Sequence, residues 1–331
     1  MKLYSLLFCT FAAVMEVISM PMWAWILFYA LVIVMLYADL KLFGRKGQHE
    51  VSIKEALQMT GVWIAVSLIF CAGIWFYEGD NKAMEFLAGY LIEKSLSMDN
   101  LFVFLMLFSF FGVQRKYQHE VLFWGIFGAL ILRSIFIFAG AAMVQRFEWI
   151  LAIFGIFLIY TGIKMFGHQD ESVDPSNNIF VKLFKKFFPV TDQMHEDKFF
   201  IIENGKRLAT PLFIALLVIE TTDVAFAVDS IPAVFSVSRD PFIVLTSNIF
   251  AILGLRALYF ALAAIAQYFQ YLKYGLGIIL SFVGVKMLLE VAPEPYHYEV
   301  RTPISLLIIF GVLVLSMLAS YVATLYSRRR Q

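Results

Sequence analysis

Five acidic side chains lie inside long apolar stretches of the sequence. They are Glu93, Asp99, Glu220, Asp223 and Asp229. An acid at the centre of a membrane-spanning helix costs about 2.5–3.5 kcal/mol on insertion scales, so such acids serve ion pathways, proton relays or buried ion pairs. We favour a path for a cation or a proton, because the acids outnumber the bases near them, Arg133, Arg256 and Lys94. The alternative is that these bases neutralise the acids in purely structural ion pairs.

Neutral oxygen atoms accompany the acids. On a helix, Glu93, Ser97 and Asn100 share one face, and Thr222 and Asn248 lie in the second half of the chain. Carboxylates, hydroxyls and amides are ligands of hard cations such as Mn²⁺, Mg²⁺ and Ca²⁺. Zinc and copper are disfavoured, because all five histidines fall in predicted loops and neither cysteine lies near the acids. We therefore expect a hard-cation site made by the five acids and supported by these oxygens, with the two arginines beside it.

The elements that carry these residues are predicted to be membrane helices. Of the 331 residues, 61% are hydrophobic and 15% charged, and the mean hydropathy is +0.79, whereas soluble domains average about 45–50% apolar and 25% charged residues. A spanning helix needs about 20 predominantly apolar residues. Nine stretches meet this length: 21–40, 57–77, 84–111, 121–144, 148–166, 209–235, 241–265, 272–290 and 302–325. We predict an all-α polytopic membrane protein with about nine transmembrane helices.

Positive charges are distributed unequally between the two sides of these spans. Sixteen Lys and Arg residues fall on one side, and four fall on the other: Lys82, Arg146, Arg239 and Arg301. Because Lys and Arg concentrate in cytoplasmic loops, we expect the C-terminus and the hydrophilic loop 167–208 to be cytoplasmic. Asp39 closes the first span at that side, where it could line an ion vestibule, although an interfacial acid next to Lys41 is the commoner arrangement. A net charge of +1 does not indicate a nucleic-acid partner.

An internal repeat relates the two halves of the chain. Each half carries two acids six residues apart, Glu93 and Asp99 in the first and Asp223 and Asp229 in the second. The motifs IFGALILR and IFAILGLR follow, and then GIKM and GVKM, in the same order. Each unit contains three spans, an odd number, so the second should insert upside down relative to the first. Inverted repeats of this kind are typical of secondary transporters, whose sites lie at the repeat interface.

The repeat divides the chain into consecutive parts. Residues 1–20 are ambiguous between a further helix, a signal-like segment and sequence upstream of the true start. The parts that follow are two peripheral helices in 21–83, the first repeat in 84–166, a cytoplasmic linker in 167–208, the inverted second repeat in 209–290, and a final helix with a basic tail in 291–331.

Four longer motifs are specific enough to indicate a family. They are YLIEKSLSMDNLFVFLMLFS at 90–109, ILRSIFIF at 131–138, EWILAIFG at 148–155 and VIETTDVAFAVDSIPAVFSVSRDPFIVLTSNIFAILGLRALYF at 218–260. The chain resembles the TerC family over roughly residues 21–326, and most closely its Alx-type members. The resemblance implies an integral membrane protein of the wider LysE-type transporter group, linked to tellurite resistance and, in Alx-type members, to Mn²⁺ export. The intramembrane acids of that family map onto the five acids above.

We expect a secondary transporter that exports Mn²⁺ from the cytoplasm of a bacterium across its inner membrane, by cation/proton antiport. Clustered buried carboxylates favour proton coupling, because burial raises their pKa into a range where metal and proton compete; only the resemblance selects manganese. Asp99 and Asp229 are expected to bind the ion, with Glu93 and Asp223 behind them, and Glu220 to tune the site or relay protons. We expect no enzymatic activity and no permanently bound cofactor. The partners would be Mn²⁺, protons, lipid and, as an open alternative, further copies of the chain.

Two other functions stay open. One is a membrane scaffold of a metal- or tellurite-stress complex, in which the acids serve structure, and the other is export of another hard cation such as Ca²⁺. An intramembrane aspartyl protease is not indicated, because the sequence has no GxGD motif.

Overall fold

The computed structural model describes residues 20–44, 53–147, 149–167, 179–191, 198–203, 205–265, 271–293, 296–298 and 300–328. The N-terminal segment 1–19 lies outside these ranges, so its nature stays a prediction. The helices are α2 (Met22–Gly44), α3 (Ile53–Glu78), α4 (Asp80–Phe110), α5 (Arg115–Arg146), α6 (Trp149–Lys164), α7 (Ile179–Phe187), α8 (Pro211–Phe235), α9 (Pro241–Leu253), α10 (Leu255–Ile265), α11 (Leu272–Val291) and α12 (Thr302–Arg328).

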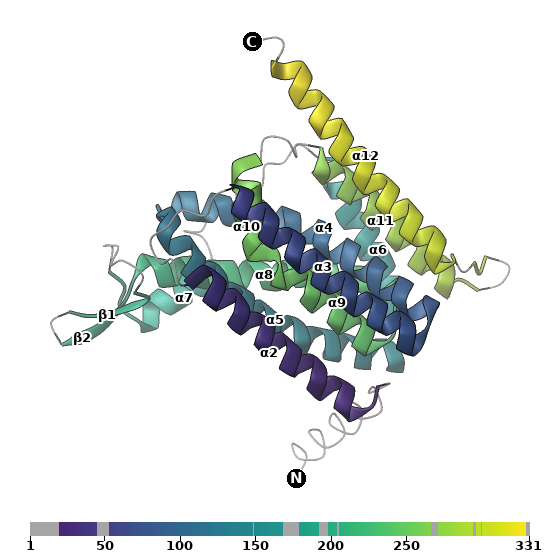
Figure 1. The fold of residues 1–331 in the computed structure, drawn as a ribbon, viewed down its shortest axis with the longest axis horizontal. Helices are drawn as coiled ribbons and strands as arrows, with labels where there is room; N and C mark the ends of the chain where they lie inside the picture. Colours follow the sequence, from purple (N-terminus) through teal and green to yellow (C-terminus); the bar gives the residue numbers. More distant parts are fainter. Residues whose placement is uncertain are drawn as a thin grey trace.

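The protein is a bundle of apolar helices, as the composition predicts (Figure 1). All nine predicted stretches are helical. Among the described residues, six helices are long and apolar enough to cross a membrane, and the bent pair α9–α10 counts as a seventh if it is one span. Helix α6 is apolar but has only 16 residues. The composition and these helices support a polytopic membrane protein, in whose described residues six or seven spans, rather than the nine predicted, meet the length and composition of a membrane helix.

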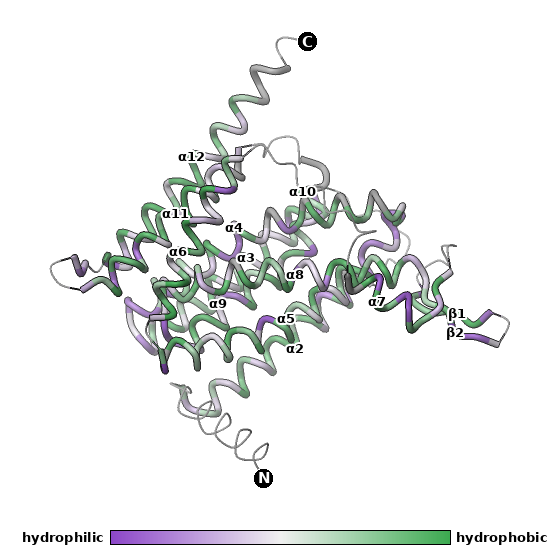
Figure 2. The backbone as a smooth tube through the Cα atoms, turned by 180° about the vertical axis from the view of Figure 1, so that it is seen from behind, coloured by the Kyte–Doolittle hydropathy of each residue, from purple (hydrophilic) through white to green (hydrophobic). Residues whose placement is uncertain are grey.

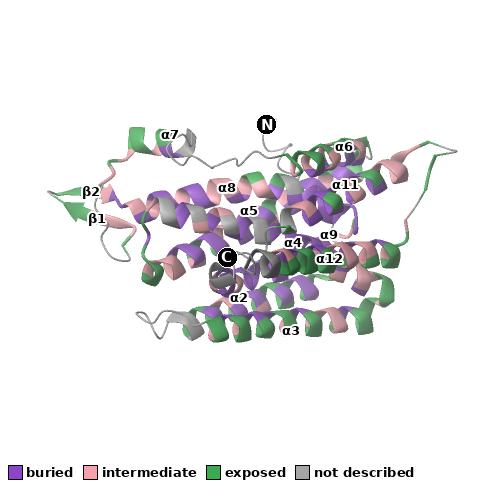
Figure 3. Cartoon of the chain, turned by 90° about the horizontal axis from the view of Figure 1, so that it is seen from above, coloured by how far each residue is buried: buried purple, intermediate pink, exposed green. Residues whose placement is uncertain are grey.

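Large apolar side chains cover the outside of the bundle. Ile69 on α3, Leu307 on α12 and Ile33 on α2 are each about two-thirds or more exposed. The backbone tube of Figure 2 shows long green stretches, the colour of hydrophobic residues, along α2, α3 and α12. In Figure 3 the exposed residues of α3 lie along its outer edge and its buried residues along the edge that faces the other helices. Because a water-exposed surface would not carry so many unpartnered apolar side chains, these outer faces fit contact with lipid.

The predicted span 241–265 is broken rather than continuous. Helices α9 and α10 meet at Gly254 with a bend of 42°. Glycine has low helix propensity, and here a side chain at position 254 would lie 3.0 Å from Lys94 Nζ. Lys94 Nζ also donates a hydrogen bond of 3.0 Å to the Ala251 carbonyl. The lysine thus satisfies a carbonyl next to the break, which the hydrophobicity of the stretch could not indicate.

Helices α6 and α11 pack closely through glycines. A Cβ atom on Gly155 would lie 2.9 Å from the Gly284 carbonyl oxygen, and a Cβ atom on Gly162 would lie 2.7 Å from the Gly277 carbonyl oxygen. Because the residue numbers of the contacts increase along α6 and decrease along α11, the two helices are antiparallel. Small residues allow this approach of two backbones, which is a common means of helix association in membranes.

The segment 167–208, predicted to be a linker, contains folded structure. Helix α7 is followed by an antiparallel hairpin of β1 (Phe200–Glu203) and β2 (Lys206–Ala209), so the all-α prediction holds for the bundle and is wrong for this segment. The rings of Phe184 and Phe200 lie 5.1 and 4.6 Å from the ring of Phe213 at the start of α8. Such short elements are stabilised by tertiary contacts rather than by their own propensity, and the sequence pattern does not reveal those contacts.

Candidate functional site

A buried arginine lies at the centre of the bundle. Arg133 on α5 has no exposed side-chain surface and forms ion pairs with Glu93 of α4 and Asp223 of α8. Its Nε and Nη2 atoms donate to the two carboxylate oxygens of Asp223, at 3.3 and 3.2 Å. Its Nη1 atom donates to Glu93 Oε1. The planar guanidinium therefore holds two acids that are 130 residues apart in sequence, an arrangement for which arginine is better suited than lysine.

Neutral side chains complete the shell around this arginine. Nη1 also donates to Ser230 Oγ at 3.1 Å and to Asn248 Oδ1 at 3.3 Å. The Asn248 amide in turn donates to Glu93 Oε2 at 2.9 Å, and Ser97 Oγ donates to Glu93 Oε1 at 3.3 Å. Buried charges are tolerated when they are paired and hydrogen-bonded. We call these six residues the Arg133 cluster: Glu93, Ser97, Arg133, Asp223, Ser230 and Asn248.

Four helices supply this cluster: α4 and α8 each bury two of its polar residues, and α5 and α9 each bury one. Glu93 and Ser97 are one turn apart on α4 and share a face, as predicted. Asp223 and Ser230 come from α8, and Asn248 from α9, all of whose residues are buried. No single helix has to be unwound to bring the groups together. Glu93 and Asp223 thus meet at Arg133 because the helices that carry them face one another.

Other predicted site residues are not part of the cluster. The side chains of Asp99 and Asp229 lie outside the described part of the structure, although their backbones belong to α4 and α8. Thr222 Oγ1 donates to the Val218 carbonyl of its own helix at 2.7 Å, and Asn100 is buried on α4. Within the described residues, no three His, Cys, Asp or Glu side chains are grouped to hold a metal ion. The cation site therefore stays a prediction.

Comparison with known proteins gives the family. Residues 78–330 match the model of the integral membrane protein TerC family. The chain belongs to the TerC family. It is 47% identical over 313 residues to an Escherichia coli K12 protein provisionally named membrane-bound redox modulator Alx, covering 92% of this chain and 95% of that one. The Salmonella typhi protein of the same name is 45% identical over 311 residues, with the same coverage.

A further relative broadens the comparison. An uncharacterized membrane protein of Myxococcus xanthus is 47% identical over 302 residues, which cover 90% of this chain and 92% of that protein. No solved structure matches this chain. The family resemblance seen in the motifs is therefore confirmed.

A second buried ion pair joins α2 to α10. Arg256 Nη2, at the start of α10, lies 2.8 Å from Asp39 Oδ2 and donates to the Asp39 backbone carbonyl at 2.6 Å. Asp39 is 4% and Arg256 1% exposed. Asp39 is therefore a buried partner of Arg256 rather than an interfacial acid next to Lys41. The sequence alone could not reveal this pair, because 217 residues separate its members.

In the part of the chain that the structure describes, Glu220 forms no ion pair with Arg133 or Arg256. Among the described residues its Oε2 atom is buried without a hydrogen-bond partner. The carboxylate packs over Gly128 of α5, where a Cβ atom would overlap it. Gly128 thus provides the space for this acid. In the sequence, this contact could be suspected only from the presence of Gly128 inside a predicted spanning stretch.

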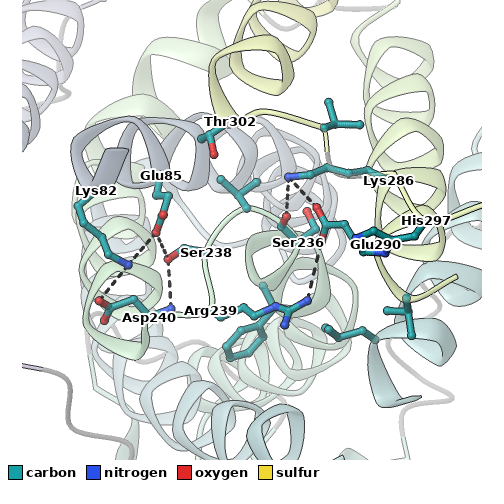
Figure 4. A pocket seen from close by; sticks show the side chains of 15 residues that line it. Lys82, Glu85, Ser236, Ser238, Arg239, Asp240, Lys286, Glu290, His297 and Thr302 are labelled. Carbon is teal, nitrogen blue, oxygen red and sulfur yellow. Dashed lines mark hydrogen bonds and ion pairs between the residues drawn. The ribbon is translucent and has the colours of Figure 1, made fainter. Parts of the chain in front are cut away.

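A polar cavity opens at the end of the bundle where α4 begins and α11 ends (Figure 4). Its volume is about 640 Å³. Charged groups from three regions line it: Lys82 and Glu85 of α4, Arg239 and Asp240 before α9, and Lys286 and Glu290 of α11. Sequence reasoning missed these residues as a group, because acids and bases near helix ends are ordinary in a membrane protein.

The charges in this cavity are paired. Lys82 Nζ lies 3.1 Å from Glu85 Oε2 and 3.2 Å from Asp240 Oδ2. Burial lowers the pKa of Lys82, but the two carboxylates outweigh it, so the pKa is raised overall. Lys286 Nζ donates to the Ser236 carbonyl at the end of α8, at 2.8 Å. The cavity is thus an open polar mouth whose walls are held by ion pairs.

Proposed function

We propose that this TerC family protein is a secondary transporter that exports Mn²⁺ by cation/proton antiport, without a chemical step or a resident cofactor. One observation carries the proposal: Glu93 and Asp223, which occupy matching positions in the two sequence repeats, meet at one buried point. Acids buried in this way are characteristic of ion and proton pathways. The choice of Mn²⁺ rests on the family resemblance and on the hard oxygen groups around that point.

The architecture that we propose is an inverted repeat, with α4–α6 as one unit and α8–α11 as the other. The glycine contacts support it. Gly155 and Gly277 each precede the lysine of the GIKM or GVKM motif by nine residues, so they are repeat mates, as are Gly162 and Gly284. The observed contacts are Gly155 with Gly284 and Gly162 with Gly277. Replacing each glycine by its repeat mate turns one contact into the other, as a twofold rotation would. This is the expectation for two units that are inverted relative to one another.

In this proposal the Arg133 guanidinium is a tethered counter-cation. It neutralises Glu93 and Asp223 while no metal is present, at a point surrounded by carboxylate, amide and hydroxyl oxygens. A divalent cation or protons would compete with the guanidinium for the two acids, because each of them reduces the negative charge that holds the arginine. Asp99 and Asp229, farther along the same helices, would bind the ion, and Glu220 would exchange protons.

The proposed orientation places the C-terminus and the segment 167–208 in the cytoplasm of a bacterium, as the Lys and Arg asymmetry favours. The polar cavity then faces the opposite side. It would serve as the exit for the ion, since its carboxylates are balanced by lysine and arginine and hold a departing cation only weakly.

The test is Mn²⁺ flux in proteoliposomes that contain the purified protein, with and without a pH gradient. We expect flux that increases with an opposing proton gradient and falls at least tenfold in Asp99→Asn and in Asp229→Asn. Glu78→Gln, which changes an exposed acid at the end of α3, is the matched control and should transport normally. Equal flux in the Asn variants would refute the site. Ca²⁺ flux measured in parallel decides between the two hard cations.

A second candidate function is a membrane scaffold. The pairing of Glu93 and Asp223 with Arg133 favours it, because ion pairs of this kind can serve structure alone. The scaffold predicts no Mn²⁺ flux from folded protein and a loss of abundance when the pair is broken. The name redox modulator belongs to the relatives. If this chain had a redox role that used its cysteines, Cys9→Ala and Cys71→Ala would be expected to change that role.

A further inference from the structure

We propose that α7 is a membrane-surface helix that binds anionic lipid headgroups at the boundary of the bilayer. The observation behind the proposal is a nine-residue helix, outside the spans, whose surface is divided into three faces. One face packs on the protein, one is exposed and apolar, and one is exposed and basic. This inference does not depend on which ion, if any, the protein transports.

The first face places α7 beside the start of α8. Phe184 and Phe188 are about one helical turn apart, and their rings belong to an aromatic group around Phe213: Phe184 lies 5.1 Å from Phe213, and Phe188 lies 5.8 Å from Phe200, which is 4.6 Å from Phe213. Phe213 is the third residue of a candidate span that begins at Pro211. The flank of α7 therefore lies against the start of a membrane helix, at the level of the bilayer surface.

Backbone hydrogen bonds hold the chain after α7 in place. The Ala209 amide donates to the Pro189 carbonyl at 3.0 Å, and the Thr191 amide donates to the Ala209 carbonyl at 2.9 Å. The chain that leaves α7 is thus bonded to β2, two residues before α8 begins. Figure 3 shows α7 beside the end of α8 that carries the hairpin. These bonds keep α7 next to the start of α8.

The second face is apolar and uncovered. Leu183 and Phe187 are four residues apart, so they share one side of the helix, and they are 53% and 76% exposed. They do not belong to the flank that carries Phe184 and Phe188. In water these two side chains would stay unburied, whereas the interface of a bilayer at this depth would receive them, as it receives the apolar side of interfacial helices.

The third face is basic. Lys185 and Lys186 are exposed, and Lys182, one turn earlier, lies on the same side. Lysines flanking an apolar face extend toward headgroups while their stems stay near the apolar surface. Each Lys near an anionic membrane surface adds about fivefold to binding. Charge complementarity therefore selects an anionic lipid as the occupant rather than a neutral one.

The experiment uses the full chain in nanodiscs. Cys9 and Cys71 are replaced by Ala, and Phe187→Cys carries a nitroxide spin label whose accessibility to oxygen and to a water-soluble nickel complex is measured. The discs contain phosphatidylcholine alone or mixed with phosphatidylglycerol. We expect the oxygen-to-nickel accessibility ratio of the label to rise when phosphatidylglycerol is added. In Lys185→Gln/Lys186→Gln this rise should be lost. Each lysine removed should lower the ratio of membrane-inserted to free label about fivefold.

Lys54→Gln/Lys116→Gln is the matched control, since it removes two exposed lysines at other helix starts and should leave the rise intact. A water-exposed label in both lipids would overturn the proposal. So would an inserted label that ignores both phosphatidylglycerol and the lysines, because lipid charge would then play no part. A label shielded from both reagents would show that protein, such as a second copy, covers this face instead.

Discussion

Arg133 of α5 holds the carboxylate of Asp223 on α8 through two parallel hydrogen bonds, Nε to Oδ2 at 3.3 Å and Nη2 to Oδ1 at 3.2 Å. The remaining Nη1 atom is directed to Glu93, Ser230 and Asn248. One guanidinium thus connects three helices that come from both sequence repeats. Because every member of this group is buried, changing one member leaves the others without compensation.

The first prediction is that Arg133→Gln strongly destabilises the protein. Removing the guanidinium leaves two buried acids without their base, which costs about 3–5 kcal/mol for a buried pair. Arg133→Lys should be intermediate, because lysine keeps the charge but cannot form the paired bonds. The measurement is the midpoint of thermal unfolding in detergent. Arg146→Gln, an exposed arginine at the end of the same helix, should change it little.

A double variant separates lost charge balance from lost packing. Arg133→Gln/Glu93→Gln removes one acid together with the base, so it should be more stable than Arg133→Gln alone. If the single variant unfolds at the wild-type midpoint, the ion pairs do not hold the bundle together. If the double variant is no more stable than Arg133→Gln, the loss of stability comes from the changed shape of the side chain and not from the unbalanced charge.

The second prediction concerns Asn248, which donates to Glu93 Oε2 at 2.9 Å and accepts from Arg133. Asn248→Ala leaves a carboxylate oxygen without its donor in a buried place, which costs about 1–3 kcal/mol. Ser247→Ala is the control, since that hydroxyl donates to the Val244 carbonyl of its own helix, at 3.1 Å, and not to a group of the Arg133 cluster. Equal unfolding midpoints for the two variants would mean that Asn248 has no part in holding Glu93.

The sequence identifies the acids of the cluster and names Arg133, Ser97 and Asn248 as candidate partners, but it does not specify which arginine pairs with which acid. A carboxylate in an apolar run is conspicuous, so Glu93 and Asp223 were identifiable at once. Arg133 and Arg256 end two nearly identical motifs, yet Arg133 pairs with the repeat acids and Arg256 with Asp39. Asp39, the partner of Arg256, comes from α2, which lies outside the two repeat segments 84–166 and 209–290. Partner choice depends on helix rotation and depth, which residue spacing within one helix does not specify.

Helix α7 could not be predicted from the sequence at all. Its apolar and basic residues alternate over only nine positions inside a charged loop, too few for a reliable periodic signal. The helix is held by Phe184 against Phe213, a contact between two segments whose relation is set only by folding. The same reason explains the missed polar cavity, whose Lys82, Asp240 and Glu290 come from three separate regions.

The third prediction tests whether Gly128 positions Glu220. A Cβ atom at position 128 would overlap the Glu220 carboxylate, which is the mobile end of a side chain and can move away. Gly128→Ala should therefore cost only about 1 kcal/mol of stability but should reduce Mn²⁺ flux as much as Glu220→Gln does. Because both changes act on one group, the double variant should be no worse than either single variant.

Gly61→Ala serves as the control for this pair, because a Cβ atom there meets nothing within 4 Å. It should leave flux unchanged. Independent, multiplicative losses in Gly128→Ala/Glu220→Gln would contradict the idea that the glycine acts through the acid. Normal flux in Gly128→Ala would show that the observed position of the Glu220 carboxylate is not required.

The last prediction concerns the glycine contacts between α6 and α11. A Cβ atom on Gly162 would lie 2.7 Å from the Gly277 carbonyl oxygen and 2.9 Å from the Ser281 amide nitrogen. These are backbone atoms, so no side-chain rotation relieves the overlap and the helices must separate. We expect Gly162→Ala to cost about 1–3 kcal/mol, as overpacking does. Gly284→Ala, the repeat mate, should cost a similar amount, since its Cβ atom would lie 2.6 Å from the Gly155 carbonyl oxygen.

Gly311→Ala on α12 provides the contrast for these two variants. A Cβ atom there meets nothing within 4 Å, and alanine is favoured over glycine in a helix by about 1 kcal/mol, so this variant should unfold at the same temperature or higher. Equal losses in Gly162→Ala and Gly284→Ala would support a twofold relation of the two units, because symmetric contacts carry symmetric costs. A large loss in one variant and none in the other would argue that the two helices meet without that symmetry.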